Sequence, residues 1–229
     1  MIKRISKSRV RVKSLRHEAR SEMNVTHAME QVKQVDLIER AIEAAVKAHE
    51  KQKRKGTKIA YITHPFAVGI TLAKAGCSEQ VIAAGILHDT IEDARIKRSR
   101  IRKEFGEKVA SIVEKCTEPD KRRPWRKRKQ HTLDSLKKAG LDVKFVFCAD
   151  KLHNIKTIAR DYGKVGERVW KRFRQGRRDQ QWYYTSLVES LRITEGNPSY
   201  EKLYKGFKSK VREVFGESQK GRIKHEQRN

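Results

Sequence analysis

The stretch "AAGILHDTIEDA", residues 83–94, places a cluster of metal-binding and acidic side chains at the end of an apolar helical run. These side chains are His88, Asp89, Glu92 and Asp93. Burying carboxylates is costly unless a partner satisfies them. If residues 79–93 form one helix, His88 and Glu92 share one face, and Asp89 and Asp93 share the neighbouring face. The stretch therefore predicts a cation site at the edge of a helical core.

Helical periodicity dominates the rest of the chain. Residues 35–52 carry a single apolar stripe, which is typical of an amphipathic helix. Ser78 is placed to cap the helix that contains the quoted stretch. Gly106 is expected to divide the segment 100–116 into two short helices. The start of 143–163 is ambiguous, since Phe145–Phe147 would also suit a strand, but its downstream spacing favours a helix. The sequence predicts an all-α fold, a compact multi-helix bundle with basic extensions at both ends.

Three regions are expected along the chain. Residues 1–30 form a basic N-terminal extension, expected to be flexible, and 31–198 form the compact domain. Residues 199–229 form a basic and weakly amphipathic C-terminal tail, because "NP" at 197–198 is expected to end the compact part. Three interpretations of the N-terminal extension stay open. It is a basic arm, or a transit-like segment, or the translation start lies at Met23 or Met29.

The charge balance is strongly basic. Lys and Arg number 55 against 28 Asp and Glu, which gives a formal net charge of +27. Such a field attracts nucleic acid, the ribosome, phosphate-rich small molecules or an anionic membrane surface. The three cysteines are unclustered, which argues against a disulfide framework or a zinc knuckle and favours a reducing compartment. With no apolar run long enough to span a bilayer, a cytoplasmic protein is expected.

An adjacent His–Asp pair can offer an imidazole nitrogen and a carboxylate oxygen to one cation. This mixture suits manganese, iron or zinc better than calcium. Two ligands make a poor site, and the further candidates are His64 in "ITHP" and Asp150 in "CADKLHN". Taken singly, a satisfied core histidine and a helix-capping aspartate explain these residues as well. Taken together, three separated segments that each offer a ligand favour a metal site.

The order of these motifs resembles a known family. "AHEKQKRKGTKIAYITHP", then "AAGILHDTIEDA", then "CADKLHN" are similar to the HD-domain hydrolases of the RelA/SpoT family, and above all to single-domain small alarmone hydrolases. The resemblance covers residues 35–195. It implies an all-α fold that binds one manganese ion and removes the 3′-pyrophosphate from guanosine tetra- or pentaphosphate. The stretch after Glu195 is too short for the synthetase domain of long family members, so degradation without synthesis is expected.

The resemblance also implies roles for individual residues. The metal ligands would be His64, His88, Asp89 and Asp150. Glu92 and Asp93 would be the catalytic acidic pair. Substrate contacts would come from Arg54, Lys55, Lys121 and Asn154. For these four residues a solvated basic surface or a surface amide is the competing interpretation, and for Trp182, Tyr183 and Tyr184 a place in the core competes with a role as walls of a base pocket.

Two other functions stay open from the sequence. An HD phosphohydrolase acting on another phosphorylated nucleotide would have the same metal site. A basic RNA- or ribosome-binding protein on an HD scaffold would use the +27 charge, because neutralising phosphates releases counterions. No recognised nucleic-acid-binding motif supports that second alternative. The sequence leaves the oligomeric state open.

Overall fold

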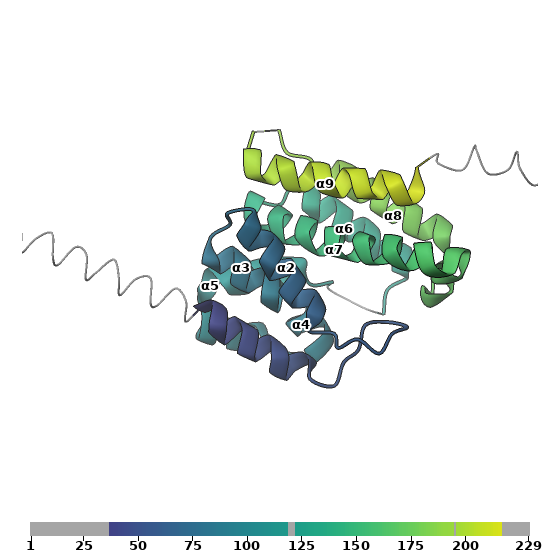
Figure 1. Ribbon diagram of the computed structural model, residues 1–229. Coiled ribbons are helices and arrows are strands. Elements are labelled where there is room, and N and C mark those ends of the chain that lie inside the picture. Colours follow the sequence, from purple (N-terminus) through teal and green to yellow (C-terminus); the bar gives the residue numbers. More distant parts are fainter. Residues whose placement is uncertain (1–36, 119–121, 195, 217–229) are drawn as a thin grey trace, which may run out of the picture. The chain divides into compact units, whose positions relative to one another are not determined.

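The computed structural model describes residues 37–118, 122–194 and 196–216 (Figure 1). Of the unit formed by residues 1–40, only 37–40 are described, and they are helical. The second unit, residues 41–229, begins with a helical segment, 41–49. Its further helices are α2 (Thr63–Lys74), α3 (Glu79–Leu87), α4 (Thr90–Ala94), α5 (Arg98–Cys116), α6 (Trp125–Lys137), α7 (Leu141–Val165), the 3-10 helix η1 (Gly166–Arg172), α8 (Arg177–Ser190) and α9 (Pro198–Phe215).

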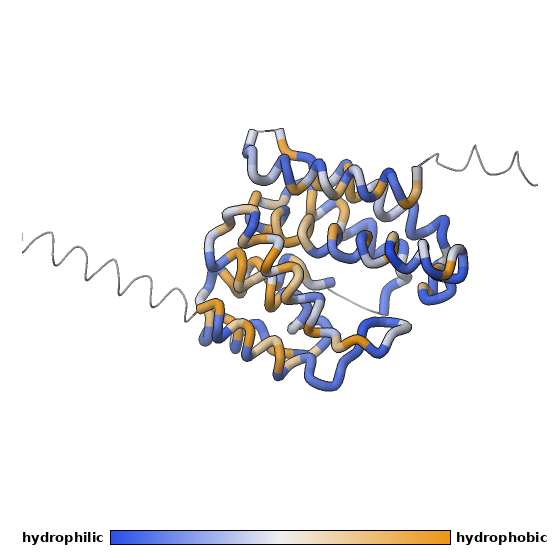
Figure 2. Tube along the Cα trace, viewed as in Figure 1, coloured by the Kyte–Doolittle hydropathy of each residue, from blue (hydrophilic) through white to orange (hydrophobic). Residues whose placement is uncertain are grey.

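The predicted all-α class is confirmed, and α7 is the central element of the second unit. It packs against α9, α2, η1, α3 and α5, and Figure 1 shows α9 lying along it. Its first half is buried and its second half is polar, a change that is visible along the tube in Figure 2. The stretch that also suited a strand, Phe145–Phe147, is helical and buried. Burial on every side removed the periodicity that would have identified it as a helix.

Close contact between α2 and α3 fixes the part of the core beneath the quoted stretch. All seven residues from Val81 to Leu87 are buried, and Figure 2 shows α2 and α3 as largely hydrophobic. Gly69 on α2 and Gly85 on α3 permit this approach. A Cβ atom on Gly85 would lie 2.2 Å from Leu72 Cδ1, and one on Gly69 would lie 2.7 Å from Ile86 Cγ1. The two helices thus bring the residues at their ends together.

The mutation Gly85→Ala is expected to destabilise the protein by about 1–3 kcal/mol, because the added methyl group overpacks the α2–α3 contact. Urea unfolding followed by circular dichroism measures this free energy. The matched control is Gly206→Ala in α9, where an added methyl group would meet no described atom within 4 Å beyond its own helix backbone and chain neighbours. The control should be neutral or stabilising, since alanine favours a helix over glycine. Equal effects in both variants would contradict close α2–α3 packing.

The expectation of one helix over 79–93 is wrong. Helix α3 ends at Leu87 and α4 begins at Thr90, so His88 and Asp89 lie at the break. Two side-chain hydrogen bonds stabilise it: His88 Nδ1 pairs with the carbonyl oxygen of Gly85 at 2.8 Å, and Thr90 Oγ1 donates to the carbonyl of Leu87 at 2.7 Å. Both residues keep right-handed helical backbone angles at the break, with φ −55° and ψ −32° at His88 and φ −95° and ψ −2° at Asp89.

The compact part also continues past residue 198. Asn197 caps α9 by accepting a hydrogen bond from Tyr200 N at 2.9 Å, and Pro198 stands at the first helical position. The buried side of α9 consists of Tyr200, Leu203, Phe207, Val211 and Phe215. The expected tail from 199 onward is therefore wrong up to Phe215. Residues 217–229 and the expected extension 1–30 lie outside the described residues.

Gly106 was expected to divide its segment into two helices, and the structure confirms it. Gly106 interrupts α5 with φ 85° and ψ 168°, a conformation that favours glycine. In the described parts of the chain, no helix combines the length and the apolar character that crossing a membrane requires.

Candidate metal centre and active site

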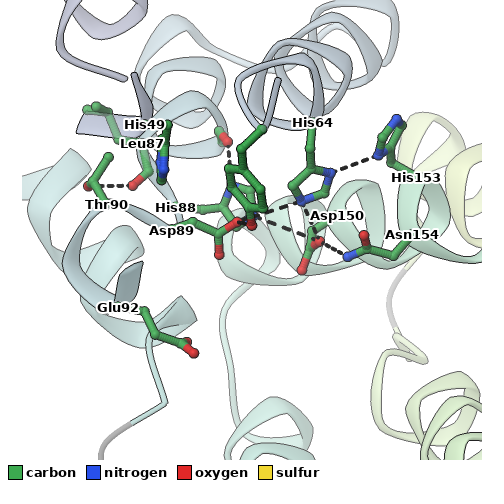
Figure 3. A network of polar contacts seen from close by, with 12 residues as sticks. His49, His64, Leu87, His88, Asp89, Thr90, Glu92, Asp150, His153 and Asn154 are labelled. Atoms are coloured by element: carbon green, nitrogen blue, oxygen red, sulfur yellow. Dashed lines mark hydrogen bonds and ion pairs between the residues drawn. The ribbon is translucent and has the colours of Figure 1, made fainter. Parts of the chain in front are cut away.

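Three separate segments supply the four predicted metal ligands. His64 is the second residue of α2, His88 and Asp89 form the break between α3 and α4, and Asp150 lies in the buried half of α7. His64, His88 and Asp150 are buried, with 1%, 4% and 6% of their surface exposed. Figure 3 shows the four side chains turned toward one another. Because the segments are far apart in sequence, only packing of α2 and α3 against α7 brings these groups together.

The ligand atoms of His64, His88 and Asp150 all lie within 4.8 Å of one another. His64 Nε2 is 3.1 Å from Asp150 Oδ1, and His88 Nε2 is 3.8 Å from the same oxygen. Asp89 adds a fourth group, because its Oδ2 lies 2.9 Å from His88 Nε2 and 3.7 Å from His64 Nε2. Two imidazoles and two carboxylates therefore converge on one small volume.

The residues fit a divalent transition-metal ion. His88 Nε2 is buried and has no hydrogen bond of acceptable geometry among the described residues, although Asp89 Oδ2 lies 2.9 Å away. The other nitrogen of His88 pairs with the Gly85 carbonyl at 2.8 Å, and His64 Nδ1 lies 2.7 Å from His153 Nδ1. Such outer contacts orient histidine ligands in metal sites. They leave both Nε2 atoms directed at the cluster.

Electrostatics inside the cluster favour a cation. Burial lowers the pKa of His64, which favours the neutral imidazole that a metal requires. For His88, burial acts in the same direction, but the carboxylates of Asp89 and Asp150 raise its pKa to about 9. Burial would raise the pKa of Asp150, yet Lys151 and the histidines hold it well below its usual range. The carboxylates thus stay ionised and attract positive charge.

Three neighbours of the cluster were missed by the sequence analysis. Tyr61 donates a hydrogen bond to Asp89 Oδ2 at 2.5 Å, Lys151 Nζ lies 2.7 Å from Asp150 Oδ2, and His153 contacts His64. Lys151 and His153 stand inside the "CADKLHN" motif, so their proximity to Asp150 was the available signal. Tyr61 stands inside the motif "AHEKQKRKGTKIAYITHP", three residues before His64, but its contact with Asp89 joins positions 28 residues apart.

The mutation Tyr61→Phe is expected to lower the affinity for a divalent metal ion by about 10- to 100-fold, because it removes the group that orients Asp89. Isothermal titration of metal-free protein measures the affinity. The control is Tyr204→Phe, since the Tyr204 hydroxyl donates to the Val188 carbonyl at 2.9 Å in another part of the unit. An unchanged affinity for Tyr61→Phe would show that Asp89 needs no such support.

Two cavities adjoin the cluster. The smaller, of about 180 Å³, contains the four candidate ligands with Glu92 and Asp93 in its wall. The larger, of about 490 Å³, has the volume of a nucleotide-sized ligand site. Five residues line both cavities, namely Tyr61, Lys129, Lys151, Asn154 and Tyr183. A molecule in the larger cavity can therefore extend one end toward the candidate metal ligands.

The predicted substrate residues lie at the larger cavity, apart from Lys121, which is outside the described residues. Arg54 donates to Asn154 Oδ1 at 2.9 Å, and Asn154 Nδ2 donates to Asp150 Oδ1 at 2.6 Å. This chain links the cavity wall to a candidate ligand. Lys55 Nζ lies 5.8 Å from the centre of the Phe173 ring.

For the aromatic residues of α8 the two interpretations do not exclude each other, since Tyr183 and Tyr184 meet both and the half-buried Trp182 meets neither. Tyr183 and Tyr184 are buried, with 4% and 5% exposed, and both also line the larger cavity. Trp182 is not among its described lining residues, and the Arg126 guanidinium stacks on it at 3.5 Å. Trp125 lines the cavity in its place, a residue that the sequence analysis did not single out.

Glu92 and Asp93 belong to α4, directly after the break. Figure 3 shows Glu92 on a different side of the cluster from Asn154. Glu92 Oε2 accepts a hydrogen bond from Glu118 N at 3.3 Å, and Gln52 Nε2 donates to the Asp93 carbonyl at 3.2 Å. The acidic pair is thus held at the wall of the smaller cavity, beside the candidate ligands and not among them.

The fold and the site together define an all-α protein with a histidine–aspartate cluster, a candidate metal centre, beside a basic and aromatic cavity. Comparison with known families gives a match to the HD domain over residues 41–182. This match spans more than half of the chain and includes all four candidate ligands. The chain belongs to the HD-domain family.

Individual relatives agree with this assignment. Guanosine-3′,5′-bis(diphosphate) 3′-pyrophosphohydrolase MESH1 of Xenopus tropicalis is 35% identical over 127 residues, which cover 54% of this chain and 70% of MESH1. A pyrophosphohydrolase of the same description from Aquifex aeolicus is 35% identical over 123 residues, 53% of this chain. The chain spans only 18% of the Aquifex protein and 14% of a similar GTP pyrophosphokinase of Streptomyces coelicolor.

Two solved structures are similar over two thirds or more of this chain. A Listeria monocytogenes protein aligns with a TM-score of 0.63 and 32% identity, over 67% of this chain and 99% of that one. A metazoan ortholog of SpoT, described as hydrolysing ppGpp, aligns with a TM-score of 0.64 and 26% identity, over 79% of this chain and 97% of that one.

Proposed function

We propose that this protein is a metal-dependent hydrolase that removes the 3′-pyrophosphate from guanosine 3′,5′-bis(diphosphate). The products are pyrophosphate and GDP, or GTP when the substrate is the pentaphosphate. The observation that carries this proposal is the shared wall between the His–Asp cluster and the larger cavity. The activities named for the Xenopus and Aquifex relatives support it.

Manganese is the proposed ion, held by His64, His88, Asp89 and Asp150. The mixed nitrogen and oxygen ligand set suits manganese, iron or zinc better than calcium. When bound, such an ion lowers the pKa of water and polarises phosphoryl oxygens. Lys151, which lines both cavities, partly neutralises the negative charge of Asp150.

Glu92 and Asp93 are proposed to manage the protons of the reaction. Water attacks the phosphorus atom that is bonded to the ribose 3′ oxygen, and the bond between that phosphorus and the 3′ oxygen breaks. One carboxylate of the pair orients the water and takes its proton, and a proton is returned to the departing 3′ oxygen. The position of both residues in the wall of the smaller cavity supports this role.

The remaining proposed substrate contacts come from the larger cavity. The Arg54 guanidinium can stack on a purine or pair with phosphate, and Lys55 can pair with phosphate. Asn154 joins Arg54 to Asp150, so its amide connects nucleotide binding with the metal centre. Lys121 stays a predicted pyrophosphate contact.

A substrate panel tests the proposed reaction against the nearest alternative, an HD phosphohydrolase for another nucleotide. Purified, manganese-loaded protein is incubated separately with guanosine tetraphosphate, its adenosine analogue and NADP, and the products are separated by anion-exchange chromatography. We expect GDP and pyrophosphate from the guanosine compound at the highest kcat/KM. If the adenosine analogue or NADP released phosphate or pyrophosphate faster, that compound would be the better substrate and the proposed one would be wrong.

The RNA or ribosome contact remains a prediction from charge. The relatives and solved structures named above give it no support, and the two basic termini lie largely outside the described residues. A band shift with ribosomal RNA at physiological salt would support it. If no band shift occurred, the predicted RNA or ribosome contact would be wrong.

A further inference from the structure

The larger cavity carries more positive charge than one reacting pyrophosphate requires. Among its described lining residues, the basic side chains outnumber the single acid, Asp161. The lysines and arginines are Arg54, Lys55, Lys129, Lys151, Arg160 and Arg172. Lys129 and Lys151 also line the smaller cavity and can serve the reacting group. The other four line only the larger cavity, so a second anionic group on the same ligand would balance them.

Arg172 is the most firmly positioned of these four residues. It ends η1, and its Nη1 donates to Asp161 Oδ2 at 2.6 Å. Asp161 is 8% exposed, and its other oxygen lies 3.5 Å from Arg160 Nε. A guanidinium has five N–H groups, so the bond to Asp161 leaves others for a ligand. An arginine that a buried carboxylate holds at a cavity wall provides a pre-organised site for an anion.

The loop that contains Arg54 and Lys55 closes on the same arginine. Gly56 has φ +71°, in the left-handed region that favours glycine. A Cβ atom at Gly56 would lie 3.0 Å from Arg172 Cδ and 3.1 Å from its Nε. The backbone of the loop therefore packs directly on the arginine side chain. Contacts from Asp161 and from Gly56 restrict Arg172 on two sides.

We propose that Arg172 is a specificity-determining residue that binds a second phosphate group of the substrate, the one carried by the 5′ carbon of the ribose. This inference rests on the proposed function, since it assigns the far end of the same substrate. Arg172 lines the larger cavity and is absent from the described wall of the smaller one, so its partner is not the group that reacts. The competing explanation is an ion pair that only stabilises the end of α7.

The test compares two substrates that differ only at the 5′ position. Guanosine 3′,5′-bis(diphosphate) and guanosine 3′-diphosphate share the reacting group, but only the first has 5′ phosphates. In Arg172→Gln, kcat/KM for the first substrate should fall by about 10- to 100-fold, as expected for a lost charge-assisted hydrogen bond. For the second substrate it should change by less than about threefold, because the missing partner was never bound.

Two further variants control for structure. Arg168→Gln makes the same chemical change in η1 at an exposed residue outside the described cavity wall, and it should leave both substrates unaffected. Arg172→Lys keeps a positive charge beside Asp161 and should fold even if Arg172→Gln does not. Because lysine lacks the planar fork, it should retain only part of the preference for the 5′-phosphorylated substrate.

Equal losses on both substrates, or no loss on either, in a folded Arg172 variant would overturn this inference alone. Wild-type protein that releases no pyrophosphate from either substrate would refute the proposed function and the inference together. The wild-type measurements therefore separate the two failures.

Discussion

Replacing Asp150 by asparagine is expected to lower the turnover of guanosine tetraphosphate by about a thousandfold or more, since metal-ion catalysis contributes several kcal/mol and each 1.36 kcal/mol is tenfold in rate. Asp150 Oδ1 lies 3.1 Å from His64 Nε2 and 3.8 Å from His88 Nε2, so its oxygen joins both imidazoles. An amide is a poor substitute for a carboxylate ligand. Manganese binding, measured by electron paramagnetic resonance of the free ion, should weaken in parallel.

The control for this variant is Asp134→Asn on α6. Asp134 is exposed and pairs with Lys137 at 3.2 Å, outside both cavities, so activity and metal binding should not change. Asp150→Asn also removes the carboxylate that pairs with Lys151. Leaving the lysine charge unpaired lowers the stability of the folded protein. If that variant does not fold, Asp89→Asn tests the same centre and keeps the Asp150–Lys151 pair. A folded variant with full manganese binding would contradict the assigned metal centre.

The mutation Glu92→Gln is expected to lower kcat by about 10²- to 10⁴-fold, the range for removal of a general acid or base. Manganese affinity should stay within about threefold of the wild-type value, because Glu92 lies in the cavity wall and outside the set of candidate ligands. Glutamine can still accept the hydrogen bond from Glu118 N, so the local structure should persist. Stopped-flow turnover with metal titration separates the two effects.

Glu213→Gln on α9 is the matched control, since Glu213 pairs with Lys210 on an exposed surface. It should alter neither kcat nor metal affinity. If Glu92→Gln lost manganese affinity in proportion to kcat, Glu92 would act as a ligand and its assignment as a proton-transfer residue would be wrong.

The sequence was sufficient for the class of fold and for the groups that gather at the centre. His64, His88, Asp89 and Asp150 each stand at a conspicuous position within an apolar segment, so residue type and motif order pointed to them. The four do converge in the structure. Their role as metal ligands stays a prediction.

The hydrophobic pattern was insufficient at two places in the backbone. Side-chain hydrogen bonds to the carbonyls of Gly85 and Leu87 accompany the break at His88–Asp89, and a hydrophobic run gives no sign of it. Helix α9 was missed because a high positive charge hid its apolar side, whose residues become buried. Packing of that apolar side against α7 and α8 makes α9 part of the compact unit.

The far wall of the larger cavity was also beyond the sequence. Arg172 was one of many arginines in a basic segment, and nothing local distinguished it from Arg168 or Arg174. Its distinction comes from Asp161 on α7 and from the close approach of Gly56, a residue more than a hundred positions earlier. Such long-range contacts single out one charge among similar ones.

The central claim is tested most directly by pyrophosphate release from guanosine tetraphosphate, with added manganese, with chelator, and with the Asp89→Ala variant. We predict release of pyrophosphate and GDP that requires manganese, stops with chelator and is absent from the variant. Folded, manganese-loaded wild-type protein that releases no pyrophosphate would contradict the proposed function, and release that persists in chelator and in Asp89→Ala would contradict the metal centre.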